Sequence, residues 1–243
     1  MKGNVLVTGG SRGIGRAIAI RLARDGWTPL IHYRKEKSAA EEVALQTGGK
    51  AVPFGADLSR KEECKRLWDW VKEQGEIAAL VNNAGIYVPQ PFDIKEEAEF
   101  DRVWESSFAT NFWSAVYLSR WFISQAARGA KILNVCSRVG FRGEAGAAAY
   151  AATKGALINL TRSLAVEFAP KGIYVFGIAP GWVETAMTRE GMEKRRKEIE
   201  AGIPFGRVAT PEECATVASF LLSEEAEYLT GVVIDINGAS YFH

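Results

Sequence analysis

The chain has 243 residues, of which 47% are hydrophobic, and this suffices to bury a sizeable core in one α/β domain over residues 1–243. Its 30 basic and 29 acidic residues are interspersed and leave a net charge of +1, so the basic surface of a nucleic-acid-binding protein is missing. No window approaches the roughly 18 apolar residues that span a bilayer, and we expect a soluble, cytoplasmic protein with neither nucleic acid nor membrane as a partner.

Short apolar runs alternate with longer amphipathic segments along the chain. The apolar runs predict seven strands, at 5–7, 28–31, 51–54, 79–81, 131–135, 173–178 and 232–236. The segments 15–25, 61–74, 100–127, 150–169 and 211–222 are each long enough for a helix. This alternation predicts an α/β fold, a doubly wound Rossmann-type domain whose seven-stranded, mostly parallel sheet carries helices on both faces. The segment 186–206, with a charged helical piece at 190–200, is an excursion that we interpret as a substrate lid.

The cysteines give no sign of a disulfide framework or a metal site. Cys64, Cys136 and Cys214 are odd in number, widely separated and without C-x-x-C or Cys/His spacing. We therefore expect no metal cofactor, and a reducing compartment fits the three thiols.

Four glycines lie between the first strand and the first helix, in VTGGSRGIGRA at 7–17. Glycine permits positive φ and lets the backbone approach a pyrophosphate at the N-terminus of the following helix. Gly9, Gly13 and Gly15 follow the spacing T-G-x-x-x-G-x-G rather than G-x-G-x-x-G. A tight strand-to-helix connection explains this pattern as well, so further motifs have to decide.

The further motifs are NNAG at 82–85, Ser137, YAATK at 150–154 and PGWVET at 180–185. Together with the glycine turn and the order of elements, they resemble the short-chain dehydrogenase/reductase family over essentially the whole chain. The closing stretches IPFGRVATPEECATVASFLLS and YLTGVVIDINGASY resemble the 3-oxoacyl-(acyl-carrier-protein) reductase-like branch and the sugar or polyol dehydrogenases.

The resemblance implies a catalytic set of Asn111, Ser137, Tyr150 and Lys154. Tyr150 and Lys154 are four residues apart, so they share one face of a helix. A nearby ammonium is expected to lower the pKa of the tyrosine from about 10, which suits a general acid–base. By resemblance, Tyr150 gives a proton to the substrate carbonyl and Ser137 donates a hydrogen bond to the same oxygen. Lys154 holds the nicotinamide ribose, and Asn111 positions a water that relays protons.

The end of the second strand bears on cofactor choice. Sites for NAD place an acid about 20 residues after the glycines, but Tyr33 lies 18 residues after Gly15 and Arg34 follows it. A carboxylate would repel a 2′-phosphate, whereas a guanidinium binds it. With Arg12 in the glycine turn, this pattern predicts that NADP(H) is preferred over NAD(H). Solvated surface charge is the alternative interpretation of the two arginines.

The resemblance also implies further contacts to the cofactor and to the substrate. The expected cofactor-binding residues are Gly9, Ser11, Arg12, Gly13, Ile14, Gly15, Tyr33, Arg34, Asp57, Leu58, Asn83, Ala84, Gly85, Tyr150, Lys154, Pro180, Gly181, Val183 and Thr185. Substrate contacts are expected from the loop after Val139, from 87–92 and from 186–206, where Phe141, Tyr87, Trp182, Met187 and Met192 suggest an apolar pocket. A homotetramer is expected, as in the family.

These observations predict an NADPH-dependent oxidoreductase that reduces a small-molecule carbonyl, 3-oxoacyl thioester-like or a related ketone, with Tyr150 as proton donor. A sugar or polyol dehydrogenase using NADP or NAD is the alternative, and a non-catalytic NADPH-binding protein is a further one. The four intact catalytic positions disfavour the latter. A Ser-His-Asp hydrolase is disfavoured because His32 and His243 are the two histidines and no G-x-S-x-G elbow occurs. The natural substrate stays open.

Overall fold

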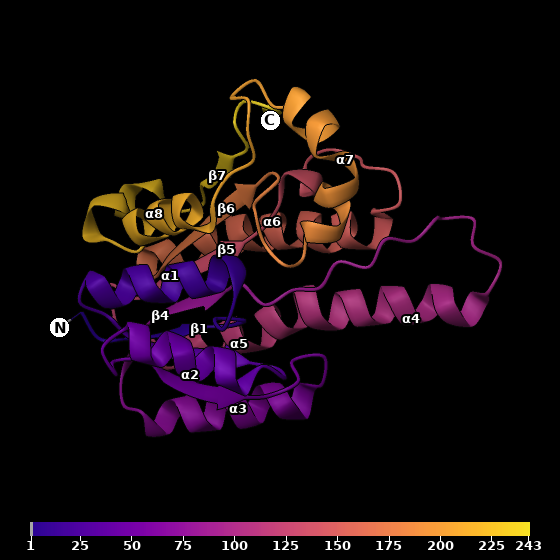
Figure 1. Cartoon of the computed structure of the whole chain (residues 1–243). Coiled ribbons are helices and arrows are strands. Elements are labelled where there is room, and N and C mark those ends of the chain that lie inside the picture. Colours follow the sequence, from indigo (N-terminus) through magenta and orange to yellow (C-terminus); the bar gives the residue numbers. More distant parts are fainter. Residues whose placement is uncertain (1) are drawn as a thin grey trace.

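A computed structural model describes residues 2–243, apart from the side chain at position 190. It contains a seven-stranded sheet in the order β3-β2-β1-β4-β5-β6-β7 (Figure 1). The strands are Asn4–Val7 (β1), Thr28–Tyr33 (β2), Val52–Gly55 (β3), Ile77–Asn82 (β4), Lys131–Val135 (β5), Tyr174–Pro180 (β6) and Val233–Ile236 (β7). All adjacent pairs are parallel, and the predicted doubly wound Rossmann-type fold is confirmed with its seven strands.

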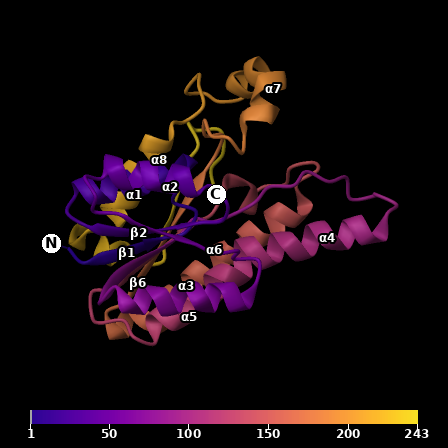
Figure 2. The ribbon, with the colours of Figure 1, turned by 60° about the horizontal axis from the view of Figure 1, so that its bottom comes forward.

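Helices cover both faces of the sheet, as Figure 2 shows. One face carries α1 (Gly13–Arg24), α2 (Lys37–Gln46) and α8 (Pro211–Leu221), and the other carries α3 (Lys61–Glu73), α5 (Ser114–Ile123) and α6 (Ala148–Phe168). Helix α4 (Glu97–Phe108) extends beyond the sheet and continues into α5 through the π-helical turn Ala109–Trp113. Helix α7 (Arg189–Ala201) projects away from the sheet.

The structure corrects two helix predictions. The helix expected over 100–127 begins at Glu97, ends at Ile123 and contains the π-helical turn. Helix α2 was not predicted, and it buries only Ala40 and Val43, so its sequence carries a weak apolar periodicity. The helical piece expected near 190–200 is present as α7, but the role of 186–206 as a lid stays a prediction.

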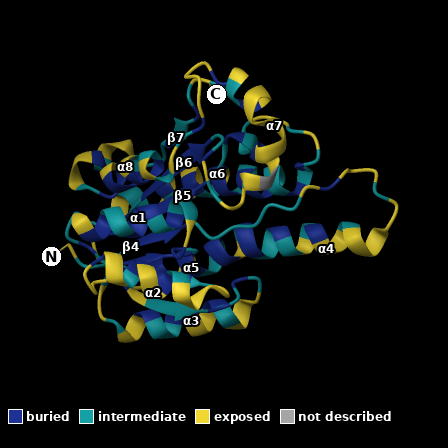
Figure 3. Ribbon diagram, viewed as in Figure 1, coloured by how far each residue is buried: buried dark blue, intermediate teal, exposed yellow. Residues whose placement is uncertain are grey.

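The apolar core consists of one layer on each face of the sheet. Val5 and Val7 of β1 face α1 and α8, whereas Leu6 of the same strand faces α3 and α5. Successive side chains of a strand point to opposite faces, so each central strand contributes to both layers. Figure 3 shows the strands buried between helices whose outer sides are exposed. Within residues 2–243, no helix has the length and apolar character needed to cross a membrane.

The strand order reverses between β1 and β4, and Thr8 joins the ends of these two strands. Its Oγ1 accepts hydrogen bonds from the backbone N–H groups of Asn83 and Ala84, both at 2.9 Å, and donates to the carbonyl of Val81 at 3.2 Å. The side-chain amide of Asn83 donates back to the Thr8 carbonyl at 2.8 Å. Ligands of open parallel sheets bind at such a reversal, so these bonds shape the place where a ligand is expected.

Replacing Thr8 by Val keeps the shape of the side chain but removes the acceptor for two backbone N–H groups. We expect Thr8→Val to lower the free energy of unfolding by about 1–3 kcal/mol, the cost of leaving the Ala84 N–H without an acceptor. The Asn83 N–H keeps the carbonyl of Val81, at 3.1 Å, as an acceptor. Urea denaturation measures this change, and Thr8→Ser, which keeps the hydroxyl, serves as the control. Equal denaturation midpoints for Thr8→Val and the wild type would show that these bonds add no stability.

Candidate active site

The predicted catalytic residues meet at the carboxyl end of β5. Ser137 follows this strand and precedes a short 3-10 turn that ends at Gly140, while Tyr150 and Lys154 lie on α6. The turn packs directly on the helix backbone, since a Cβ at Gly140 would lie 2.9 Å from the carbonyl carbon of Lys154. On the helix side, Gly155 allows the same close packing of the two backbones. A Cβ at this position would lie 3.3 Å from the Gly140 carbonyl oxygen. This close contact places Ser137 beside Tyr150.

The pKa of Tyr150 differs from the expectation. Burial raises the pKa of Tyr150 to about 12, and a hydrogen bond with Ser137 opposes this rise. The prediction of a lowered tyrosine pKa is wrong for this structure, because desolvation raises the pKa. The Lys154 ammonium lies 5.6 Å from the centre of the tyrosine ring. Tyr150 is therefore protonated at neutral pH, the state that a proton donor needs.

Lys154 is a buried cation, with 3% of its surface exposed. Its Nζ donates a hydrogen bond to the carbonyl of Val135, at the end of β5, at 2.7 Å. Burial lowers the pKa of Lys154 to about 8, because desolvation disfavours the charged form. A lysine with such a pKa changes its charge close to neutral pH, as groups at functional sites often do.

The π-helical turn places Asn111 near the same corner. Its Oδ1 accepts from the Ile86 N–H at 2.7 Å, and its Nδ2 donates to the Ile86 carbonyl at 3.0 Å and to Thr153 Oγ1 at 3.2 Å. Gly85 lies between Asn111 and Lys154, since a Cβ there would be 3.3 Å from Asn111 Oδ1 and 3.7 Å from Lys154 Nζ. The side chains of Asn111 and Lys154 therefore both lie next to Gly85. The role of Asn111 in holding a water stays a prediction.

The glycine turn is held by a buried histidine whose role sequence reasoning missed. The N–H of Gly9 donates to Nδ1 of His32 at 3.0 Å, and the N–H of Gly10 donates to the His32 carbonyl at 2.9 Å. Because Nδ1 accepts, Nε2 carries the proton and donates to the carbonyl of Ala56 at 2.9 Å. Burial lowers the pKa of His32 to about 4, so the ring is neutral at neutral pH. A histidine in the second apolar strand was the available signal.

The start of α1 fits the phosphates of a dinucleotide. Among the described residues, no side chain caps this helix end, and its first turn contains no acid. Its N–H groups and the positive end of its dipole are therefore free to bind an anion. A Cβ at Gly15 would collide with Asn83 Nδ2 and the Gly9 carbonyl oxygen. Gly13 has a φ of +54°, which favours glycine. The backbone thus forms an open cradle at this point.

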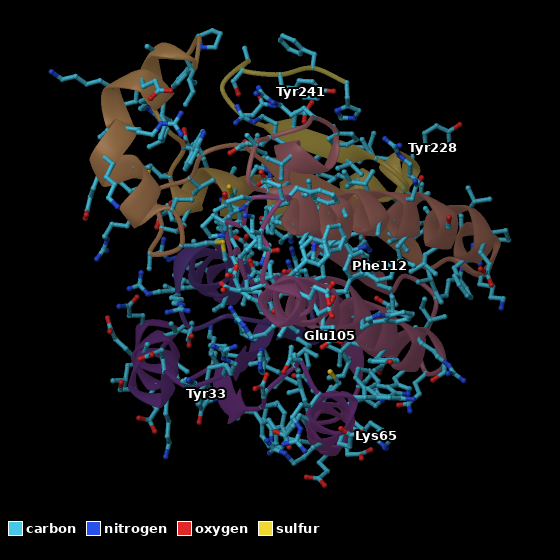
Figure 4. All side chains as sticks on the ribbon, turned by 90° about the vertical axis from the view of Figure 1, so that its right-hand side faces the viewer. Tyr33, Lys65, Glu105, Phe112, Tyr228 and Tyr241 are labelled. Carbon is cyan, nitrogen blue, oxygen red and sulfur yellow. The ribbon has the colours of Figure 1, made fainter. Side chains whose placement is uncertain are left out.

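The residues expected to determine the preference for NADP(H) over NAD(H) lie at the end of β2 and beside the glycine turn. Arg12 and Arg34 are exposed, and within residues 2–243 neither guanidinium has a hydrogen bond or an ion pair. Tyr33, labelled in Figure 4, is the last residue of β2. Partial burial acts against the ionisation of Asp57, but hydrogen bonds from Ser59 and the charge of Arg34 lower its pKa. Asp57 and Arg34 therefore lie near each other.

The other predicted cofactor residues lie along the same edge of the sheet. Thr185 faces the glycine turn, since a Cβ at Gly13 would lie 3.3 Å from its Cγ2. Pro180 ends β6, and the N–H of Gly181 donates to the carbonyl of Ile236 at 2.9 Å. Four further predicted residues are buried or half-buried, namely Ser11, Ile14, Leu58 and Val183.

An open cavity lies beside the catalytic residues, and Ser137 and Tyr150 belong to its wall. Of the predicted substrate contacts, Tyr87, Trp182 and Met187 line this cavity. The other two do not: Phe141 stacks on the ring of His243, and Met192 packs in a separate apolar cluster. A second hollow, lined by Arg12, Gly13 and Thr185 among others, lies beside the glycine turn.

Comparison with known proteins identifies relatives of the whole chain. The family model described as enoyl-(acyl carrier protein) reductase matches residues 9–239. The 3-oxoacyl-[acyl-carrier-protein] reductase of Aquifex aeolicus is 38% identical over 97% of this chain and 96% of its own length. The acetoacetyl-CoA reductase of Allochromatium vinosum is 38% identical over 98% of both chains.

A solved structure agrees with these relatives. The crystal structure of 3-ketoacyl-(acyl-carrier-protein) reductase from Brucella melitensis complexed with NADH has a TM-score of 0.89, with 32% identity over 99% of this chain and 98% of that one. The chain therefore belongs to the short-chain dehydrogenase/reductase family, in its 3-oxoacyl-(acyl-carrier-protein) reductase-like branch, and is an NAD(P)-dependent oxidoreductase acting on CH–OH or C=O groups.

Proposed function

We propose that this protein uses NADPH to reduce a small-molecule ketone, with Tyr150 as proton donor and 3-oxoacyl thioesters as the leading substrate class. The observation that carries the proposal is a half-buried, protonated tyrosine beside Ser137 in the wall of a cavity. Two relatives are named for the reduction of 3-oxoacyl and acetoacetyl thioesters, which supports this substrate class. The apolar side chains of Trp182 and Met187 in the cavity wall suit an acyl chain.

The chain's own residues then perform the proton chemistry. The hydroxyls of Ser137 and Tyr150 hold the substrate's carbonyl oxygen and stabilise the negative charge that develops on it. Tyr150 gives its proton to this oxygen, and the Lys154 ammonium, 5.6 Å from the ring centre, stabilises the phenolate that remains. A bound nicotinamide cofactor supplies the hydride.

The residues present fit NADPH better than NADH. The cradle at the start of α1 would hold the pyrophosphate, and Lys154 the nicotinamide ribose. Family membership leaves the choice of cofactor open, since one solved relative is complexed with NADH. The preference for NADPH rests on Arg12 and Arg34, whose guanidinium groups are unpaired among the described residues, and on Tyr33 in the place of an acid.

We also propose a homotetramer, as the resemblance implies. Exposed apolar residues support an interface, among them Val166 on α6, Phe220 on α8 and Tyr228, which Figure 4 labels. Each of these side chains is a candidate for a contact between subunits, because an interface would bury its apolar surface.

Removing the hydroxyl of Tyr150 tests the proton donor. We expect Tyr150→Phe to lower kcat for acetoacetyl-CoA reduction by about 10² to 10⁴-fold, the usual contribution of a positioned proton donor, while NADPH affinity is kept. Turnover follows from NADPH absorbance and affinity from its fluorescence. Tyr117→Phe, the same change on α5, is the matched control and should behave as the wild type. Near-normal turnover of Tyr150→Phe would refute the assignment.

The charge of Lys154 predicts a pH dependence. Since the pKa of Lys154 is about 8 and that of Tyr150 about 12, the ammonium loses its proton first as the pH rises. The kcat/KM for reduction should be constant below the pKa of the lysine and fall above it. In Lys154→Arg the side chain keeps its charge at high pH. The fall of kcat/KM in this variant should therefore occur at a higher pH than in the wild type, even though the variant is slower. The two profiles are measured from about pH 6 to 10, and a flat wild-type profile would contradict this role.

Substitution of the two free arginines tests the cofactor preference. Arg12→Ala and Arg34→Ala should each weaken NADPH binding by about 10- to 150-fold, the value of a charge-assisted contact to phosphate, and leave NADH binding nearly unchanged. Tyr33→Asp combined with Arg34→Ala should reverse the preference, because the new carboxylate repels the 2′-phosphate. Dissociation constants for both cofactors are compared with those of Arg24→Ala, at the far end of α1. Equal weakening of both cofactors would make the arginines ordinary surface charges.

A further inference from the structure

Arg138 is a buried cation in the wall of the active-site cavity. It follows Ser137 directly in the chain and lines the same cavity as Ser137 and Tyr150. Only 7% of its surface is exposed. A buried charge is costly unless hydrogen bonds or an opposite charge compensate it, so the partners of this guanidinium decide what it does.

The partners of Arg138 leave most of its donors unused. A guanidinium has five N–H donors, and within residues 2–243 one of them is satisfied, by Nη1 donating to Ser240 Oγ at 2.7 Å. Nε is buried without any partner. The carboxylate of Glu144, in the wall of the same cavity, forms an ion pair with Nη2 at 3.8 Å. This distance is beyond the roughly 2.7–2.9 Å of a charge-assisted hydrogen bond. The group is therefore held in place but incompletely satisfied.

The C-terminal segment fixes the position of this side chain. Ser240 holds the guanidinium, and its neighbour Tyr241, labelled in Figure 4, donates through its hydroxyl to the carbonyl of Phe141 at 3.3 Å. The side-chain amide of Asn237 in turn donates to the Tyr241 carbonyl at 2.9 Å. Segments about 100 residues apart thus meet around Arg138, and such preorganisation lowers the entropy lost when a ligand binds.

We propose that Arg138 binds a carboxylate of the substrate, so that oxo acids with an anionic group close to the reacting carbonyl are a further substrate class of this enzyme, beside the neutral 3-oxoacyl thioesters. The planar fork of a guanidinium matches the two oxygens of a carboxylate, which would accept from the donors that Glu144 is too distant to satisfy. Ser137 and Tyr150 would hold the carbonyl of the same molecule. The inference rests on the proposed function for the place of that carbonyl and adds the class of ketone that fits.

The turnover test compares acids with their neutral esters. Pyruvate, acetoacetate and levulinate, each against its methyl ester, are assayed with the wild type, Arg138→Gln and Arg142→Gln. We expect the wild type to favour at least one acid over its ester. Arg138→Gln should lower kcat/KM for that acid by about 10- to 150-fold, mainly through KM, and change the ester little. Arg142→Gln removes an exposed charge four residues away and should leave both substrates unchanged.

A wild-type preference for every ester, or an equal loss of acid and ester in Arg138→Gln, would overturn the proposal, because a purely structural arginine affects both alike. Arg138→Lys keeps the charge without the fork, and it should fold and show an intermediate loss if glutamine prevents folding.

A binding measurement separates this inference from the proposed function. Butanoate and butanamide, which cannot be reduced, are titrated calorimetrically into the wild type and Arg138→Lys. Tighter binding of butanoate, weakened by the substitution, supports the arginine site even if no ketone turns over, which would refute the proposed function alone. Reduction of the esters without preferential binding of butanoate would refute the arginine site and leave the proposed function standing.

Discussion

The hydroxyl of Thr8 joins the ends of β1 and β4, and the geometry of the whole site depends on this junction. Parallel strands expose unpaired backbone groups where they end, and Thr8 satisfies two of those N–H groups at the point where the strand order reverses. The same contact holds Asn83 against Gly9 and so shapes the cradle at the start of α1. From the opposite side, His32 holds the Gly9 N–H, so the glycine turn is fixed by two neighbouring strands.

Burial, more than the attraction between charges, sets the proton affinities at the reacting end of the site. Desolvation raises the pKa of Tyr150 and lowers that of Lys154, which moves both groups toward their neutral forms. A neutral tyrosine retains the proton that reduction consumes. The lysine is close to losing its charge at neutral pH. The carbonyl of Val135 accepts a hydrogen bond from its ammonium group and so stabilises the charged form.

The short turn after β5 brings three roles together. Its glycine end packs on the backbone of α6, which positions the turn against Tyr150, and its first residues present a hydroxyl and a guanidinium to one cavity. Ser137 is a residue that the family motif predicts, whereas Arg138 follows from no motif. The family's chemistry and the selectivity of this particular chain can therefore reside in adjacent residues, with the C-terminal segment as the support of the second.

The sequence by itself determined the strands, most of the helices and the motif residues, because apolar periodicity and short-range spacing are local properties. It did not show α2, whose buried face has two residues, or the π-helical turn that places Asn111. Tertiary structure alone decided the pKa of Tyr150, since desolvation depends on everything packed around the ring. It also decided the partners of His32 and Arg138, because Ala56 and Ser240 lie 24 and 102 residues away in the chain and no local pattern records such contacts.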